Sequence, residues 1–240
     1  MARFTSARPR LRNPMVDLRP FAVRLKDDPH GETAFQEVRS RFPESASEKA
    51  RRLARAKNIL YRNDLDVGTK LGSGTTATVF SLKNYPDWVV KITFDPTDAV
   101  VMAEMMHVRP QAGIPDVAGV YDLGEGTYAI LIEKMRPLSG SVKRRVEDFA
   151  SEHEYGWSHS EREWKKWGSQ DPDSPEFAFL NAVRVLRALG FRSTDLSEDN
   201  MMTRRDGSIV GSDFGYISVE VSKRPRSRDI PVLRNSRRRR

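Results

Sequence analysis

Two short segments of alternating apolar and polar residues flank a pair of glycines in DVGTKLGSGTTATVFSL, residues 66–82. Alternation over this length, rich in β-branched residues, is typical of strands, and Gly72 and Gly74 predict a turn between them. Glycines carry no side chain, so backbone N–H groups beside them can approach an anion such as a phosphate. A turn of this kind is more often an ordinary hairpin, so its meaning depends on the segments around it.

The segments that follow predict a small antiparallel sheet with one helix. We expect a third strand in DWVVKITF (residues 87–94), a helix in AVVMAEMMHVR (residues 99–109) and a hairpin in VAGVYDLGEGTYAILIEKM (residues 117–135). Beyond Met135 the apolar spacing becomes helical, most clearly in PEFAFLNAVRVLRALG (residues 175–190). The predicted class is therefore α+β, with a sheet in the first part and mostly helices in the second.

Lys91 stands among apolar neighbours in the predicted third strand. An unpaired ammonium is costly to bury, so this lysine either reaches the surface or meets an acidic partner. Glu104, in the predicted helix, is the candidate partner, and a lysine held in this way could reach nucleotide phosphates. The alternative is an edge strand with an exposed lysine and an unrelated surface glutamate.

Three candidate site residues, Asp195, Asn200 and Asp213, lie within STDLSEDNMMTRRDGSIVGSDFG, residues 193–215. A nucleotide-bound Mg²⁺ takes a few hard oxygen ligands and keeps phosphates and water around it, a need that Asn200 and Asp213 could meet. Asp195 would then be free to accept the proton of an attacking hydroxyl or to orient that hydroxyl. Asp206 and Gly207 predict the turn of a hairpin between the two ends. The alternative is an acidic surface hairpin in a basic protein.

Taken in order, GSGTTATV, Lys91, Glu104, IEKM, DLSEDN and SDFG resemble the protein-kinase superfamily over residues 67 to about 219. The loop DLSEDNMM is similar to that of the RIO-type atypical kinases. The whole chain resembles the small early Ser/Thr protein kinases of T7-like bacteriophages. That family shares a helical N-terminal extension, a GIP segment (here residues 113–115) and a basic C-terminal region.

The resemblance implies a two-lobed kinase-like fold, with a small antiparallel-sheet N-lobe carrying one helix and a truncated, mostly helical C-lobe. It implies ATP and Mg²⁺ as cofactors, catalytic roles for Asp195, Lys91 and Glu104, and metal binding by Asn200 and Asp213. The nucleotide-binding residues that it implies are Gly72, Ser73, Gly74, Thr75, Val79, Lys91, Glu133 and Met135. The implied reaction is transfer of the ATP γ-phosphate to Ser/Thr hydroxyls of proteins, with host RNA polymerase or RNA-processing enzymes as substrates in the host cytoplasm.

The sequence departs from the usual kinase pattern in its catalytic loop and at its end. Ser193 and Thr194 stand where His and Arg are usual, so we expect no control by a phosphorylated activation loop. Ser197 replaces a common lysine, although the RIO-type loop also has serine there. No APE follows Gly215, and the helices that complete a full kinase lobe are missing. Two alternatives stay open: a catalytically weak nucleotide-binding regulator and a small-molecule kinase.

The predicted organisation has five parts: a basic, partly disordered arm (1–32), a helical extension (33–62), the N-lobe (63–135), the reduced C-lobe (136–222) and a basic disordered tail (223–240). In the extension, Ser45 and Glu48 have capping-box spacing at the start of a helix. Its basic face is expected to be solvated, and Leu53, Ile59 and Leu60 buried. We expect the extension to pack on the kinase body and partly replace the missing C-lobe helices.

The amino-acid composition limits which kinds of partner, metal site and cellular location we expect. The 240 residues carry 41 basic and 33 acidic side chains, a net charge of +8 that favours an anionic partner, and the basic tail suits non-specific contact with nucleic acid. There is no cysteine, and the four histidines lack zinc-ligand spacing, so we do not expect a transition-metal enzyme. The sequence contains no apolar run of about 20 residues. A soluble cytoplasmic protein without membrane contact is expected.

Overall fold

The computed structural model describes Pro9 and residues 42–43, 45–152, 171, 173–191, 196 and 198–214. Most of the predicted arm, residues 33–41 of the helical extension and the basic tail lie outside these residues. So do Ser193, Thr194, Asp195 and Ser197 of the catalytic loop. The predicted part boundaries therefore stay predictions.

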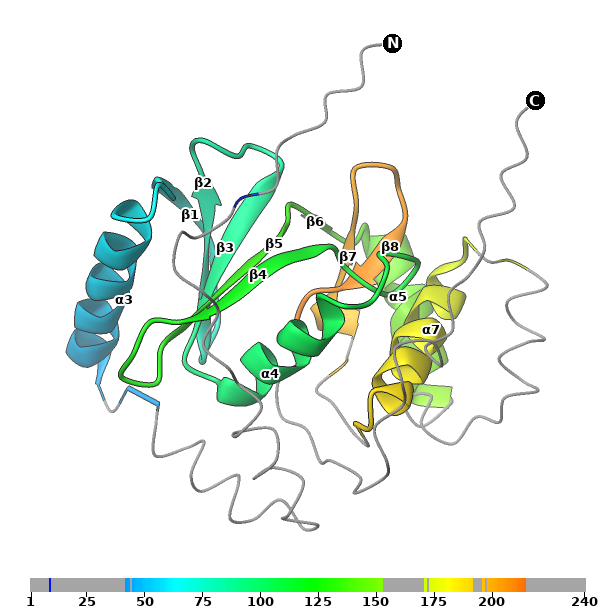
Figure 1. The fold of residues 1–240 in the computed structure, drawn as a ribbon. Coiled ribbons are helices and arrows are strands. Elements are labelled where there is room, and N and C mark those ends of the chain that lie inside the picture. The colour runs from blue at the N-terminus through cyan, green and yellow to red at the C-terminus, as the bar shows by residue number, and fades with distance from the viewer. Residues whose placement is uncertain are drawn as a thin grey trace.

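A five-stranded antiparallel sheet forms the first part of the structure (Figure 1). Its order is β1-β2-β3-β5-β4, and the strands are β1 (Val67–Ser73), β2 (Ala77–Leu82), β3 (Trp88–Thr93), β4 (Val117–Asp122) and β5 (Tyr128–Glu133). Helix α4 (Pro96–Met105) connects β3 to β4. The strands and the single helix agree with the sequence prediction, although α4 begins three residues before the predicted start because Asp95 caps it and Pro96 occupies its first turn.

Helices cover both faces of this sheet because its strands bury side chains on each side (Figure 1). On the outer face, Val90, Ile92 and Leu131 pack with Ala56 and Leu60 of α3 (Ala46–Tyr61). On the inner face, Val89, Ile130 and Ile132 join the core that contains α4. Alternate residues of the same strand thus belong to two separate cores.

Helix α3 confirms part of what was expected of the extension and corrects the rest. The Ser45 hydroxyl accepts the Glu48 N–H at 3.2 Å, as its capping position predicts, and Leu60 is buried. The basic face is not wholly solvated, however, since Arg52 is buried and Lys57 lies 4.0 Å over the ring of Phe80. The helix covers the outer face of the N-lobe sheet, so it does not take the place of C-lobe helices as was expected of the extension.

The second part combines helices with a small sheet. Its described elements are β6 (Arg136–Pro137), α5 (Gly140–Glu152), α7 (Pro175–Ala188), the short 3-10 helix η2 (Glu198–Asn200), β7 (Met201–Thr203) and β8 (Ile209–Gly211). Strands β6, β7 and β8 form an antiparallel sheet in that order. One hydrophobic core joins α5 and α7 to α4 and the inner face of the first sheet. The expected α+β class and two-part arrangement are confirmed.

The segment around Gly113 connects the two parts through the backbone. The Gly113 N–H donates to the Ile209 carbonyl at 2.8 Å, and the Gly211 N–H donates to the Gly113 carbonyl at 3.0 Å. Gly113 has φ +80°, and a Cβ built there would lie 2.1 Å from the Ala178 carbonyl oxygen of α7. Only glycine fits this conformation and this spacing. The GIP segment is therefore a joint between α7, β8 and the first sheet.

None of the helices in the described part of the chain is long and apolar enough to cross a bilayer.

Candidate functional site

Lys91 is the centre of a buried ionic cluster on the inner face of the sheet. It lies on β3 between Val79 of β2 and Ile130 of β5, its two cross-strand neighbours. Its Nζ lies 2.8 Å from Asp98 Oδ2 and 2.9 Å from Asp213 Oδ2. It also donates to the Ser212 carbonyl at 3.3 Å. The predicted need of this lysine for acidic partners is met twice, from two different parts of the chain.

Asp98, and not Glu104, is the partner that α4 provides. Among the described residues, Lys91 forms ion pairs with Asp98 and Asp213 alone, so the expected pairing with Glu104 is wrong. Glu104 lies six residues further along, which places it about 9 Å down the helix axis and on a different face. Asp98 lies in the first turn, directly after β3, where the helix is nearest to Lys91.

The start of α4 contains the signal that sequence reasoning missed. Asp95 accepts hydrogen bonds from the N–H and the hydroxyl of Thr97 at 2.8 and 2.6 Å. The order Asp95, Pro96, Thr97, Asp98 is a recognisable helix start, with a cap, a proline in the first turn and an acidic residue near the positive end of the helix. Reading that pattern would have placed Asp98 beside the end of β3.

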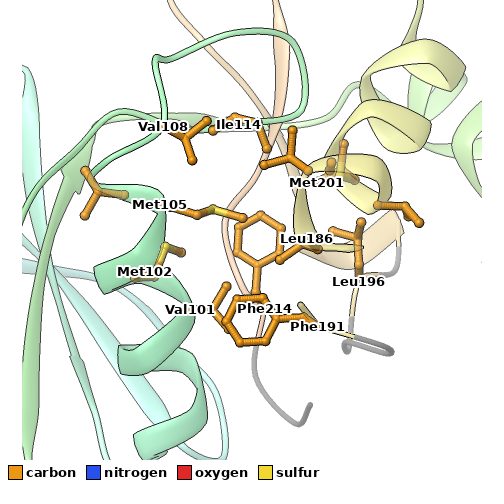
Figure 2. Packing of buried hydrophobic residues seen from close by; sticks show 14 of the residues in the cluster. Val101, Met102, Met105, Val108, Ile114, Leu186, Phe191, Leu196, Met201 and Phe214 are labelled. Carbon is orange, nitrogen blue, oxygen red and sulfur yellow. The ribbon is translucent and has the colours of Figure 1, made fainter. Parts of the chain in front are cut away.

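Phe214 fixes the position of Asp213. Its side chain is fully buried, and Figure 2 shows its ring between Met102 and Met105 of α4 and residues of the second part. A Cβ built on Gly211 would come 2.2 Å from this ring, so the close approach requires glycine. The aromatic anchor thus holds the neighbouring carboxylate against Lys91.

The structure also brings Asn200 to this place. The Ser212 N–H and hydroxyl both donate to the Asn200 carbonyl, at 2.7 and 3.1 Å. Asn200 ends η2, and Asp213 follows Ser212, so the two predicted metal ligands belong to neighbouring stretches of backbone. Asp195 lies outside the described residues, and its predicted role stays a prediction.

Burial sets the electrostatics of the cluster. It raises the pKa of Asp98 to about 7 despite the attraction of Lys91, and the charge of Asp213 acts in the same direction. Burial by itself would lower the pKa of Lys91, but its two carboxylate partners outweigh burial and raise it. Burial likewise raises the pKa of Asp95. A single ammonium is thus surrounded by more carboxyl groups than it can neutralise.

The glycine turn between β1 and β2 is open. No atom lies within 4 Å of a Cβ built on Gly72 or Gly74, so neither glycine is required by packing in this structure. Ser73 and Thr75 are exposed beside them, and the Ser73 and Thr78 hydroxyls lie 3.1 Å apart. Val79 faces the same side of the sheet as Lys91. The predicted phosphate-binding turn therefore has free space next to its backbone.

Glu133 is held by a second-part arginine at the end of β5. Arg204 Nε donates to Glu133 Oε1 and Oε2 at 2.8 and 2.9 Å, and its Nη2 lies 2.7 Å from Oε1. The same guanidinium donates to the carbonyls of Gln111 and Ile114 at 3.1 and 2.7 Å. Glu133 ends β5 and half-buried Met135 lies two residues beyond it, where a nucleotide base was expected to meet the backbone. Sequence spacing could not have found Arg204, which lies 71 residues after Glu133.

These residues fit a nucleotide with magnesium. The turn offers open space for phosphates, Lys91 offers a cation, and the Asp213 side chain is 31% exposed beside it. Asn200 and Asp213 would supply hard oxygen ligands. The described part of the chain holds no cluster of three or more His, Asp or Glu side chains suited to a metal. Phosphate and water oxygens would therefore have to complete the coordination, as Mg²⁺ prefers.

The comparisons with known proteins give a structural likeness but no match in sequence. No family model matches the sequence, and neither does a curated protein. Among solved structures, the crystal structure of Rad53 residues 1–466 in complex with AMP-PNP is similar, with 20% sequence identity and a TM-score of 0.39. The match covers 65% of this chain and 39% of that chain. At this TM-score the likeness adds nothing to the fold assignment, which rests on the strand order and the place of α4.

Proposed function

We propose that this chain transfers the γ-phosphate of ATP to hydroxyl groups, with Mg²⁺ held by Asn200 and Asp213. The observation that carries the proposal is the ion pair of 2.9 Å between Lys91 on β3 and Asp213, beside an open glycine turn. A lysine on the third strand and an aspartate before phenylalanine and glycine are the two groups that kinases place around nucleotide phosphates. Their meeting from positions 122 residues apart (213 minus 91) supports one common site.

Each residue of the site has a task in this proposal. Lys91 would bind nucleotide phosphates while Asp98 holds its ammonium in place. Asp195 would orient the acceptor hydroxyl or accept its proton. When bound, Mg²⁺ would neutralise part of the phosphate charge. Backbone groups of Glu133 and Met135 would bind the adenine.

The acceptors that we propose are Ser/Thr hydroxyls of proteins, as in the small phage kinases that the chain resembles. Host RNA polymerase or RNA-processing enzymes in the bacterial cytoplasm are the substrates that this reading favours. Ser197 does not argue against activity, because the RIO-type loop that DLSEDNMM resembles also has serine at that position. The basic tail would add non-specific contact with nucleic acid.

A transfer assay tests this function directly. The wild-type chain is incubated with γ-labelled ATP, Mg²⁺ and a generic basic protein or bacterial lysate, beside Asp195→Ala, Asp213→Asn and the control Asp87→Asn. Asp87 is a surface residue whose carboxylate lies 3.6 Å from the exposed Arg205, so its variant should keep full activity. We expect label on Ser/Thr of protein for the wild type and the control, and a large loss for the other two variants.

The outcomes separate the alternatives. Equal transfer by all four proteins would remove Asp195 and Asp213 from the reaction. ATP binding by the wild type without transfer to any acceptor would indicate a nucleotide-binding regulator. Transfer to small molecules in the lysate, with none to protein, would indicate a small-molecule kinase.

A further inference from the structure

Helix α3 contacts the glycine turn through one side chain. Lys49 Nζ donates to the Gly74 carbonyl at 2.9 Å and to the Thr75 carbonyl at 3.1 Å. These two carbonyls belong to successive peptides at the tip of the turn between β1 and β2. The residue comes from the extension, outside every motif that pointed to the nucleotide site.

The position of Lys49 is fixed because α3 is anchored one turn further along. Arg52 is buried and donates to the Gly126 carbonyl at 2.8 Å, to the Glu125 carbonyl, and to the Thr127 hydroxyl at 3.2 Å. Its guanidinium lies 4.7 Å from the centre of the Phe94 ring. Lys49 and Arg52 are three residues apart and share one side of the helix. The turn at Gly74 is therefore tied, through α3, to the turn between β4 and β5.

The direction of the carbonyls decides the direction of the amides. In a trans peptide the C=O and the following N–H point to opposite sides. With the Gly74 and Thr75 carbonyls turned to Lys49, the N–H groups of Thr75 and Thr76 point away from α3. Helix α3 covers the outer face of the sheet, so these amides point toward the side that carries Lys91.

Both amides are available for a ligand. Within the described part of the chain, neither the Thr75 nor the Thr76 N–H donates a hydrogen bond. Successive free N–H groups on one side of a turn form a concave site for an anion, and the open space beside Gly74 admits one.

We propose that Lys49 is a positioning residue, which turns the Thr75 and Thr76 amides toward the phosphates of the bound nucleotide. The inference rests on the proposed function, because a nucleotide at Lys91 is the ligand whose phosphates these amides would meet. It adds a role for the N-terminal extension: α3 sets the conformation of the phosphate-binding turn.

The test compares Lys49→Met and Lys49→Arg with the control Arg62→Met in the full-length chain. Arg62 is an exposed cation at the end of the same helix, and its side chain forms no hydrogen bond or ion pair with a described residue. Arg62→Met therefore removes a positive charge without breaking such a contact. Binding of ATP and of adenosine is measured by calorimetry, and hydrogen exchange is followed for the amides of residues 72–78 without nucleotide. Adenosine has no phosphate, so it reports the rest of the site.

We expect Lys49→Met to weaken ATP binding by about fivefold or more, the worth of roughly one lost hydrogen bond. Adenosine binding should stay unchanged, and exchange at residues 72–78 should become faster. Lys49→Arg keeps a donor within reach of the carbonyls and should restore most of the ATP affinity. Arg62→Met should resemble the wild type in every measurement.

Two results would overturn the inference: ATP binding by Lys49→Met as tight as that of the wild type, or an equal loss of ATP and adenosine affinity. The second would mean that Lys49 supports the lobe in general and not the phosphate side. A wild-type chain that binds neither ligand would refute the proposed function and this inference with it. Failure of the inference alone leaves wild-type binding intact, so the two failures can be told apart.

Discussion

Asp98 is a buried carboxyl group beside the buried ammonium of Lys91. Its side chain is 1% exposed, and its pKa is raised to about 7, so burial outweighs its ion pair with Lys91. A carboxyl with a raised pKa binds its proton more tightly in the folded chain than in the unfolded one. Between about pH 4 and about pH 7 its contribution to the free energy of unfolding therefore falls as the pH rises. Burial of the Asp98 carboxylate in this cluster therefore lowers the free energy of unfolding at neutral pH.

We predict that Asp98→Asn is more stable than the wild type, by a margin that grows with pH. The amide copies the protonated carboxyl and cannot ionise, while Lys91 keeps Asp213 as its partner. From the raised pKa, the difference in free energy of unfolding should increase by about 2 kcal/mol between roughly pH 5 and pH 8. Urea unfolding at the two pH values measures it, with Asp87→Asn as the exposed control.

The same variant should lose most of its phosphate transfer if Asp98 holds Lys91 in place, because stability and activity often conflict at such sites. A variant that is less stable than the wild type, and increasingly so toward pH 8, would contradict the argument. It would mean that the attraction between Lys91 and Asp98 exceeds the cost of burying the carboxylate.

Sequence alone left Lys91 either exposed or paired with an acidic residue, and it named Glu104 as the partner. The structure supports the paired reading, with different partners. Choosing between Asp98 and Glu104 depends on where α4 begins, and the apolar spacing that predicted the helix begins only at Ala99. Helix boundaries depend on caps more than on spacing, and a shift of three residues changes which side chain faces the strand.

At the scale of elements, the attachment of α3 depends on one buried guanidinium. Arg52 contacts the turn between β4 and β5 and the Phe94 ring. Arg51, next to it, is exposed, and its one ion-pair partner among the described residues is Glu125 at 3.5 Å. Burial works to lower the pKa of Arg52, and nearby Glu48 and Glu125 oppose this effect. The basic residues of α3 were expected to face solvent. The number of basic residues in the sequence could not show that Arg52 is the one whose side chain is buried.

We predict that Arg52→Met lowers the free energy of unfolding by about 2–4 kcal/mol, because buried carbonyls lose a charged donor. Arg51→Met should change it by no more than about 0.5 kcal/mol, the usual worth of an exposed pair. Urea unfolding followed by circular dichroism gives both values, and hydrogen exchange of residues 46–61 shows whether α3 detaches. Equal effects of the two substitutions would mean that apolar contacts at Ala56 and Leu60 hold the helix without Arg52.

At the scale of the whole molecule, the two parts share one core and one backbone joint. Phe214, Met105 and Leu186 come from different elements and pack together (Figure 2). The strands and helices were predictable because each repeats its own period of apolar residues. The contacts between the two parts, such as that of Gly113 with α7, could not be predicted. The spacing of apolar residues within one element gives no information about which distant element it packs against.

Arg204 is the polar counterpart of this joint. From the β7–β8 turn it contacts Glu133 at the end of β5 and the carbonyls of Gln111 and Ile114, so one side chain bridges both sheets. Its neighbour Arg205 has a side chain that is 91% exposed and lies 3.6 Å from Asp87. The two arginines are adjacent in sequence, but Arg204 is largely buried against Glu133 whereas Arg205 lies in solvent.

We predict that Arg204→Met lowers the free energy of unfolding by about 3 kcal/mol, since a partly buried carboxylate and two carbonyls lose their charged donor. Arg205→Met should cost less than about 0.5 kcal/mol. A double-mutant cycle with Glu133→Gln should give a coupling of about 1 kcal/mol or more between Arg204 and Glu133. Nucleotide affinity should fall with Arg204→Met as well, because Glu133 begins the segment proposed to bind adenine. Additive effects in the cycle, together with unchanged unfolding in Arg204→Met, would show that the shared core alone holds the two parts in register.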